Sequence, residues 1–170
     1  PVRDRMIVFG GDWFDIRLDD VWVLELAGAP HWTQWTPAGT APSGRHGHSA
    51  IYDPVRDRML VFGGDYSNDV WALSLTGVPT WTLVATAGTR PSGRLYQSVI
   101  YDSSRDRIVV FGGYDGATRN DVWALSLAGT PTWTLLTPTG AAPAKRDRHA
   151  ACYDSARDRM FIFAGHGDTG

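Results

Sequence analysis

The hexapeptide Met59-Leu60-Val61-Phe62-Gly63-Gly64 runs four apolar residues directly into a pair of glycines. The chain carries this pattern four times, because related hexapeptides begin at Met6, Ile108 and Met160. Arg-Asp-Arg precedes every copy, and successive copies lie 53, 49 and 52 residues apart. The chain is therefore built from an internal repeat of about fifty residues, which makes the copies units of one larger body and not separate domains.

Four strand signals fall within one period. The first is residues 48–52, matched by residues 97–101 and 149–153. The hexapeptide is the second, and its consecutive apolar residues indicate a strand that is covered on both faces. Residues 69–75 alternate as a half-buried third strand, and residues 81–83 form the fourth, whereas helical periodicity is absent. Between the second and third strands we expect a loop of variable length. The pattern predicts an all-β repeat fold.

Composition and charge narrow the range of partners. The 170 residues are 43% hydrophobic and carry a net charge of -2 with acids and bases interspersed, so we expect no nucleic-acid partner. No stretch approaches the length of a membrane span. The single cysteine, Cys152, excludes an intrachain disulfide, and its apolar surroundings predict a small buried side chain. No signal peptide is visible, but the chain begins in mid-repeat.

Three motifs recur in register along essentially the whole chain. They are Pro-Ser-Gly-Arg-x-Gly-His-Ser at 42–49, the glycine pair, and Asn68-Asp69-Val70-Trp71 with Trp81 following. Together they resemble kelch repeats, and the Asp-x-x-Arg-Asp-Arg hairpin resembles bacterial, often secreted members of that family. The resemblance implies a β-propeller with four-stranded antiparallel blades, with the first strand nearest the axis and the fourth at the rim. It also implies an extracellular or periplasmic location.

Thirteen strands make about three and a quarter blades. Residues 1–44 supply strands two to four of one blade, residues 45–93 and 94–145 two full blades, and residues 146–170 strands one and two of another. An open arc of this kind exposes two apolar blade faces, and rings close with about four to eight blades. We therefore expect either a piece of a longer propeller, whose remaining blades are the partner, or a homo-oligomer of two associating chains.

The loops from strand two to strand three and from strand four to strand one share one face of such a fold. Aromatic side chains and arginines on this face suit protein, peptide or glycan binding. The predicted binding face comprises Trp13, Phe14, Arg17, Arg45, His46, His48, Tyr66, Arg94, Tyr96, Gln97, Tyr114, Arg119, Arg148 and His149. Residues that differ between repeats are the better recognition candidates, because a scaffold role should recur. That criterion ranks His46, Tyr96, Arg148, Trp13 and Phe14 first.

Repeated positions have competing interpretations. Arg45, Arg94 and Arg146 share one repeat position, so they either bridge neighbouring blades or take part in binding. His48 and His149 share another, and they either bond to a neighbouring strand or contribute to a metal site that lacks a third ligand. The tryptophans of strands three and four are predicted to pack between blades; they are Trp22, Trp71, Trp123, Trp32, Trp81 and Trp133.

Enzyme signatures are missing, because the chain has no phosphate-binding glycine loop, nucleophile elbow or paired-histidine zinc helix. Some kelch propellers resemble copper oxidases with a Cys-Tyr pair, but Cys152 and Tyr153 are adjacent in sequence and would point to opposite faces of a strand. We therefore expect a noncatalytic binding or scaffold module for a protein partner, without cofactor or metal. The alternatives are a fragment of a secreted carbohydrate-active or carbohydrate-oxidising enzyme and a structural subunit of a larger assembly.

Overall fold

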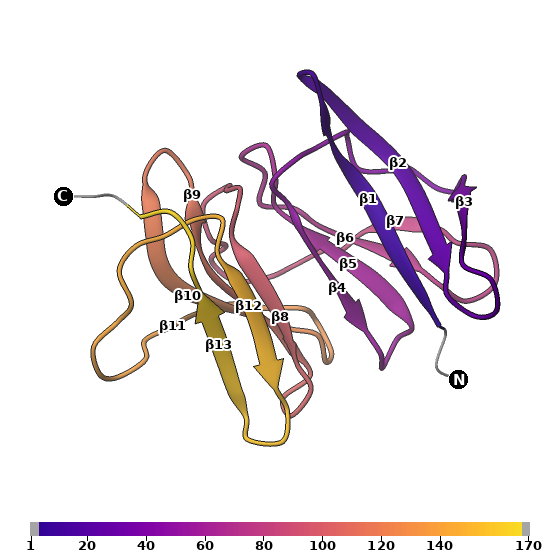
Figure 1. Ribbon diagram of the computed structural model, residues 1–170. Coiled ribbons are helices and arrows are strands. Elements are labelled where there is room, and N and C mark those ends of the chain that lie inside the picture. Colours follow the sequence, from indigo (N-terminus) through magenta and orange to yellow (C-terminus); the bar gives the residue numbers. More distant parts are fainter. Residues whose placement is uncertain (1–3, 168–170) are drawn as a thin grey trace.

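The computed structural model describes residues 4–167 and consists of β-strands arranged as an arc of four sheets (Figure 1). All strand pairs within the sheets are antiparallel. Across the described part of the chain, no helix is long and apolar enough to cross a bilayer. The predicted all-β propeller segment with four-stranded antiparallel blades is confirmed.

Each sheet is called a blade, numbered along the chain. Blade 1 contains β1 (Arg5–Trp13), β2 (Ile16–Glu25) and β3 (His31–Trp35). Blade 2 contains β4 (Ser49–Asp53), β5 (Arg58–Phe62), β6 (Val70–Ser74) and β7 (Trp81–Leu83). Blade 3 contains β8 (Ser98–Asp102), β9 (Arg107–Tyr114), β10 (Thr118–Ser126) and β11 (Trp133–Leu136), and blade 4 contains β12 (Ala150–Asp154) and β13 (Arg159–Phe163).

The strand order within the blades places one strand type at the centre of the arc. Blade 2 is ordered β4-β5-β6-β7, and blade 3 repeats that order from β8 to β11. The first strands β4, β8 and β12 lie side by side across the blades. The strand-two to strand-three connections therefore gather on one face of the arc, which is called the loop face. The Asp-x-x-Arg-Asp-Arg turns gather on the opposite face, the turn face (Figure 1).

Two of the expected loops are instead hairpins. β1 continues through the glycine pair to Trp13, and β2 begins at Ile16. The two residues between them, Phe14 and Asp15, have positive φ angles of 47° and 66°, as a tight two-residue hairpin requires. In blade 3, β9 likewise runs to Tyr114. These extensions are not evident from the sequence, because glycines and aspartates interrupt the apolar pattern.

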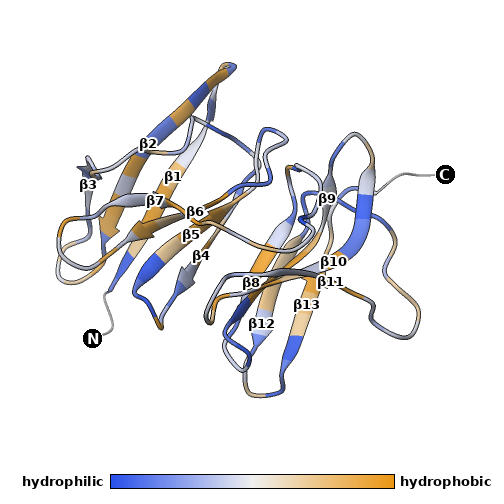
Figure 2. Ribbon diagram, turned by 180° about the vertical axis from the view of Figure 1, so that it is seen from behind, coloured by the Kyte–Doolittle hydropathy of each residue, from blue (hydrophilic) through white to orange (hydrophobic). Residues whose placement is uncertain are grey.

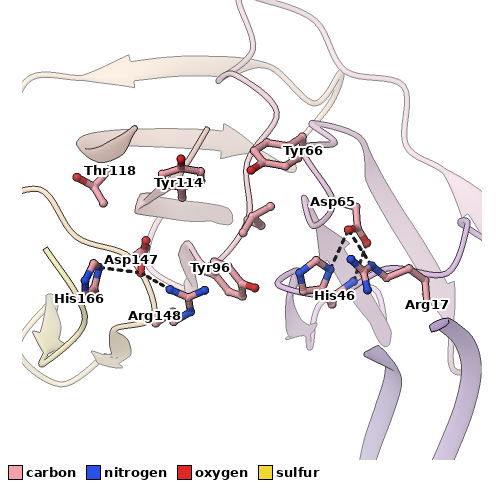
Figure 3. Close-up of a pocket in the computed structure, with 11 residues that line it drawn as sticks. Arg17, His46, Asp65, Tyr66, Tyr96, Tyr114, Thr118, Asp147, Arg148 and His166 are labelled. Carbon is pink, nitrogen blue, oxygen red and sulfur yellow. Dashed lines mark hydrogen bonds and ion pairs between the residues drawn. The ribbon is translucent and has the colours of Figure 1, made fainter. Parts of the chain in front are cut away.

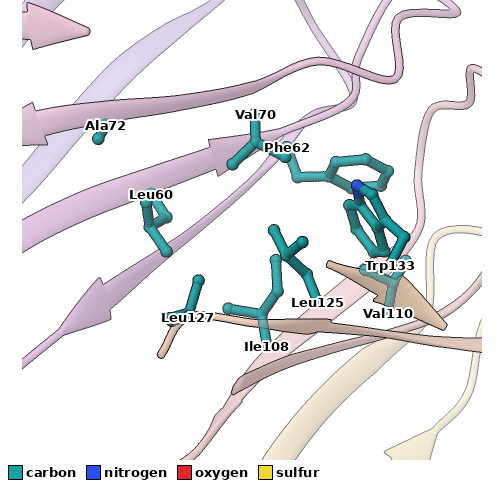
Figure 4. Packing of buried hydrophobic residues seen from close by; sticks show 9 residues of the cluster. All are labelled: Leu60, Phe62, Val70, Ala72, Ile108, Val110, Leu125, Leu127 and Trp133. Atoms are coloured by element: carbon teal, nitrogen blue, oxygen red, sulfur yellow. The ribbon is translucent and has the colours of Figure 1, made fainter. Parts of the chain in front are cut away.

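Blades pack through one repeated apolar contact. The ring centre of the fourth-strand Trp81 lies 4.9 Å from the ring centre of Phe9 in the preceding blade. The ring centres of Trp133 and Phe62 lie 5.1 Å apart in the same arrangement. Figure 4 shows the blade 2–blade 3 cluster, in which Leu60, Phe62, Val70 and Ala72 face Ile108, Val110, Leu125, Leu127 and Trp133. Both faces of β5 are buried, which explains its uninterrupted apolar sequence.

The prediction that the tryptophans of strands three and four pack between blades needs correction at Trp32. Trp81 is 3% exposed, but Trp32 at the same repeat position is 51% exposed, because no blade formed by residues 4–167 covers that side of blade 1. The third-strand tryptophans are half-buried, and Trp71 and Trp123 pack against the apolar clusters between blades, as predicted. Each third-strand indole N–H also donates to the aspartate two residues earlier, at 2.6 Å for Trp71 and Asp69. Cys152 is exposed, not buried, because β12 lies in blade 4, whose outer face no other described blade covers.

The glycine pair holds successive blades together. The second glycine donates its backbone N–H to the carbonyl of an arginine in the next blade, at 2.8 Å from Gly64 to Arg94. The first glycine has no room for a side chain. A Cβ on Gly63 would lie 2.9 Å from the Arg94 carbonyl and 2.8 Å from the Gln97 amide nitrogen, and its φ is +72°. Glycine is therefore required by both space and conformation.

Replacing Gly63 with Ala is expected to lower the free energy of unfolding by about 2–4 kcal/mol, because strain and crowding add. Gly77→Ala is the matched control, since Gly77 has a φ of +63° but nothing lies within 4 Å of the place its Cβ would take. The control should cost about 1–2 kcal/mol from strain alone. Urea unfolding of both variants measures the difference, and equal losses would contradict the role given to crowding.

Candidate functional site

A groove opens on the loop face between blades 2, 3 and 4, with a volume of about 450 Å³ (Figure 3). Its walls come from the strand-two to strand-three connections, including the ends of β2, β9 and β10, and from the segments that enter the inner strands. The lining residues are Arg17, His46, Asp65, Tyr66, Leu95, Tyr96, Tyr114, Thr118, Asp147, Arg148 and His166. The groove thus collects side chains from all four repeats.

One wall is an ionic cluster centred on Asp65. Arg17 Nε donates to its carboxylate at 3.0 Å, and His46 Nδ1 lies 2.8 Å from the same oxygen (Figure 3). Burial opposes ionisation of Asp65, but the backbone N–H of His46 and the Arg17 guanidinium outweigh it and hold the pKa of Asp65 below its usual value. Asp65 is therefore ionised near neutral pH, and it joins β2 of blade 1 to the loop of blade 2.

The floor of the groove is a stacked pair from blades 3 and 4. The Arg148 guanidinium carbon lies 3.9 Å from the centre of the Tyr96 ring, within the range of a cation–π contact. On its other side, Tyr96 meets His46 edge-to-face at 5.6 Å. Both Tyr96 and Arg148 have left-handed backbone, with φ of 61° and 53°, at the repeat position that Gly47 occupies in blade 2. These are strained conformations for residues with side chains.

The opposite wall combines tyrosines with a second carboxylate, which unlike that of Asp65 is buried. The rings of Tyr66 and Tyr114 lie 6.3 Å apart. Asp147 is buried, 3.4 Å from Arg148 and 4.0 Å from the His166 ring nitrogen (Figure 3). His166 and Asp147 also form an antiparallel backbone bridge. The groove therefore offers aromatic faces, hydroxyls and cationic groups around two carboxylates that already have partners.

Four of the predicted face residues have buried side chains and do not contribute to its surface: Arg45, Arg94, Gln97 and His149. Arg45 donates to the carbonyl of Gly63 at 3.0 Å and to Asp69 at 2.7 Å. These bonds lie within one blade, whereas the Arg45 carbonyl accepts the N–H of Gly11 in the preceding blade. The repeated arginine therefore orders its own blade with its side chain and bridges two blades with its backbone.

The repeated inner-strand position packs beneath the glycine pair. Gln97 donates to the carbonyl of Phe62 at 3.0 Å, and His149 Nε2 lies 2.7 Å from Ser98 Oγ. Burial first, and then the charge of a neighbouring arginine, lower the pKa of both His48 and His149 below 6.5. Within residues 4–167, no three His, Cys, Asp or Glu side chains come together to hold a metal ion.

The remaining predicted residues lie outside the groove but on the same face. Trp13 and Phe14 form the tip of the β1–β2 hairpin, where Phe14 is 85% exposed and the two rings lie 5.6 Å apart. Arg119 is exposed and donates to Asp115 at 2.7 Å. The structure thus brings Arg17, His46, Tyr66, Tyr96, Tyr114 and Arg148 into the groove.

Five further residues line the groove but were not predicted from the sequence: Asp65, Leu95, Thr118, Asp147 and His166. A signal for two of them existed. Leu95 and Asp147 occupy the repeat position of His46, and this position differs in every copy. The criterion that selected His46 therefore selects them as well. Asp65, Thr118 and His166 carry no such signal, because their loops differ in length.

Comparison with known families gives one assignment. The model of the KLHDC2/KLHL20/DRC7 Kelch-repeats domain matches residues 55–170, which is more than half of the chain. No curated protein matches the chain. The family match agrees with the four-stranded blades and with the motifs that join them. The chain belongs to the kelch-repeat family.

Proposed function

We propose that the chain is a noncatalytic interaction module that binds a segment of a partner protein in the groove of its loop face. The proposal rests on one observation, the strained pair Tyr96 and Arg148. Glycine meets the backbone requirement of this position, as Gly47 does in blade 2. A scaffold role alone gives no reason to place a tyrosine and an arginine in left-handed backbone, so we assign their side chains to recognition.

The chemistry of the groove agrees with a protein partner. Tyrosine and arginine are the residue types that carry much of the binding energy in protein interfaces. Arg148 remains more than half exposed beyond its stack on Tyr96, so its outer N–H groups are available to carbonyl or carboxylate oxygens of a bound segment. The exposed Trp13 and Phe14 extend the same face beyond the groove.

Selection of binding peptides from a random display library, with the chain immobilised, tests this function. Selected peptides are expected to bind with dissociation constants in the micromolar range. Tyr96→Gly and Arg148→Gly should each weaken binding at least about tenfold while changing stability by less than about 1 kcal/mol, because glycine suits the left-handed backbone. Both effects are measured on the same purified proteins, by titration calorimetry and by urea unfolding.

Val55→Ala is the matched control, because Val55 is an exposed residue on the turn face. It should bind the selected peptides as the original chain does. If the two glycine variants bind as tightly as the original chain, or if Val55→Ala loses binding instead, the groove is not the recognition site.

A further inference from the structure

Three tyrosines line the groove and give it an aromatic surface. Tyr66 lies in the β5–β6 connection, Tyr96 comes shortly before β8, and Tyr114 is the last residue of β9 (Figure 3). All three belong to blades 2 and 3, each of which has its four strands. Among the lining residues the one aliphatic side chain is Leu95, which is 4% exposed. Figure 2 shows hydrophobic residues along the strands of these two blades. The groove itself is therefore aromatic and polar, and not aliphatic.

The backbone is fixed at all three tyrosines. Tyr66 has a φ of 59°, and its carbonyl lies so close to Gly93 that a Cβ on this glycine would collide with it. Tyr114 is held within the paired strand β9. Tyr96 donates its N–H to the carbonyl of Gly47 at 2.7 Å, and a Cβ on Gly47 would lie 3.1 Å from the Tyr96 ring. A bound segment therefore loses little affinity to the ordering of the groove.

The charged side chains of the groove are paired with one another. Arg17 binds Asp65 at 3.0 Å, and Arg148 lies 3.4 Å from Asp147. The two arginines and the two aspartates balance in formal charge. Net charge therefore selects neither an acidic nor a basic segment. Selection is left to the aromatic rings and to the hydrogen-bonding groups of the groove.

The groove has free hydrogen-bond donors, whereas its carboxylate acceptors are occupied. Among residues 4–167, the hydroxyls of Tyr66 and Tyr114 make no hydrogen bond. Arg148 is more than half exposed and keeps outer N–H groups for a ligand. Asp65 already accepts the backbone N–H of His46 at 2.9 Å and a guanidinium N–H at 3.0 Å. Burying a peptide N–H without an acceptor costs free energy. The groove therefore favours a segment that accepts hydrogen bonds and donates few.

Proline has this chemistry, because it carries a carbonyl but no backbone N–H. Proline-rich segments in the polyproline II conformation dock in aromatic-lined grooves of other proteins. On the basis of the function proposed for the groove, we infer that the bound segment is proline-rich and lies along the tyrosines in this conformation. Its rings contact Tyr66, Tyr96 and Tyr114, and its carbonyls accept from the tyrosine hydroxyls and from Arg148. The polyproline II helix is preformed in free proline-rich chains, so its own ordering cost is small as well.

Three synthetic decapeptides with acetylated and amidated ends test the inference on the 170-residue chain. One is all proline, the second alternates glycine and serine, and the third carries glutamates in that glycine–serine background. Capping removes the terminal charges, so the comparison reports on the residues themselves. Titration calorimetry should show the oligoproline binding at least about tenfold more tightly than either of the other two peptides.

Variants of Tyr66 locate the contact. Tyr66→Ala should weaken oligoproline binding at least about fivefold, because one aromatic wall is lost. Tyr66→Phe keeps the ring and removes the hydroxyl, so it should weaken binding by about threefold. Tyr52→Ala is the matched control: Tyr52 is 51% exposed, close to the 56% of Tyr66, but it lies in β4 beside the turn face. The control should bind as the original chain does. Circular dichroism checks that each variant keeps the fold.

The outcomes separate this inference from the proposed function. Peptides selected from the random library could bind and lose affinity in Tyr96→Gly while the oligoproline fails to bind at about 5 mM. The groove would then recognise segments of another chemistry, and only the inference would be wrong. Tighter binding of the glutamate peptide would also overturn it, as would oligoproline binding that Tyr66→Ala leaves unchanged. If neither the selected peptides nor the oligoproline bind, the proposed function fails together with the inference.

Discussion

Replacing Trp81 with Ala is expected to lower the free energy of unfolding by about 3–5 kcal/mol, the loss typical of deleting a large buried aromatic side chain. Trp81 is 3% exposed and lies against Phe9, in a cluster that joins blades 1 and 2. Removing the indole leaves a cavity at the contact that holds two blades together. Urea unfolding followed by circular dichroism measures the loss.

Trp32→Ala is the matched control, because Trp32 has the same repeat position and residue type but is 51% exposed. The Trp32→Ala substitution should lower the free energy of unfolding by less than about 1 kcal/mol. The two variants therefore separate the effect of burial from the effect of the residue type. Similar losses at both positions would contradict the packing assigned to the fourth-strand tryptophan.

Replacing Arg94 with Ala is expected to cost about 3–5 kcal/mol, because it removes a fully buried side chain and leaves the half-buried carboxylate of Asp121 without its charged partner. Arg94 is 1% exposed. It binds Asp121 at 2.7 and 2.9 Å and the carbonyl of Gly112 at 2.9 Å. Arg90→Ala, an exposed arginine in the preceding loop, should cost less than about 0.5 kcal/mol. A cost at Arg94 no larger than that at Arg90 would show that the ion pair between Arg94 and Asp121 does not order the blade.

The ion pair also predicts a pH dependence. Burial opposes ionisation of Asp121, but hydrogen bonds from Arg94 and from the indole of Trp123 outweigh it and hold the pKa of Asp121 below 3.8. The folded state therefore binds fewer protons than the unfolded state in this range. Stability from Asp121 is fully present above its unfolded pKa and is lost as the pH falls below it. The Arg94→Ala variant should lose less stability than the original chain when the pH is lowered. Its Asp121 has already lost, at neutral pH, the arginine that favours the ionised carboxylate.

The repeat made the fold predictable from the sequence. The apolar run into Gly63 and Gly64 indicates a strand covered on both faces, and that inference needs only the absence of alternation. The arginine of the Pro-Ser-Gly-Arg motif was harder to interpret. Its recurrence pointed to a structural role, but the division of labour between an intrablade side chain and an interblade carbonyl depends on geometry that no spacing encodes.

Only part of the groove could be predicted from the sequence. Variation between repeats selected His46, Tyr96 and Arg148, because a position that changes while its neighbours recur is free of the scaffold requirement. It did not reveal that Tyr96 and Arg148 stack on each other, since they are 52 positions apart and meet only when two inner strands align. Asp65 and His166 lie in loops of unequal length, where the register between repeats is lost.

The exposed tryptophan Trp32 shows a second limit of repeat reasoning. Its position in the repeat is that of Trp81, so sequence alone assigns both to the core. Burial, however, is a property of the neighbouring blade and not of the residue. The same reasoning applies to Phe163 and Cys152 at the other end of the arc.

The indole N–H signals of the eight tryptophans provide the most direct test of the central claim, that the loop face is the recognition surface. A nitrogen–proton correlation spectrum recorded while a selected peptide is added reports on three regions at once. Trp13 marks the loop face, Trp32 the blade 1 end face and Trp81 the core. The peptide is predicted to shift the Trp13 signal and to leave those of Trp32 and Trp81 in place. A peptide that shifts Trp32 and leaves Trp13 unchanged would contradict the claim and place recognition on the end of the arc.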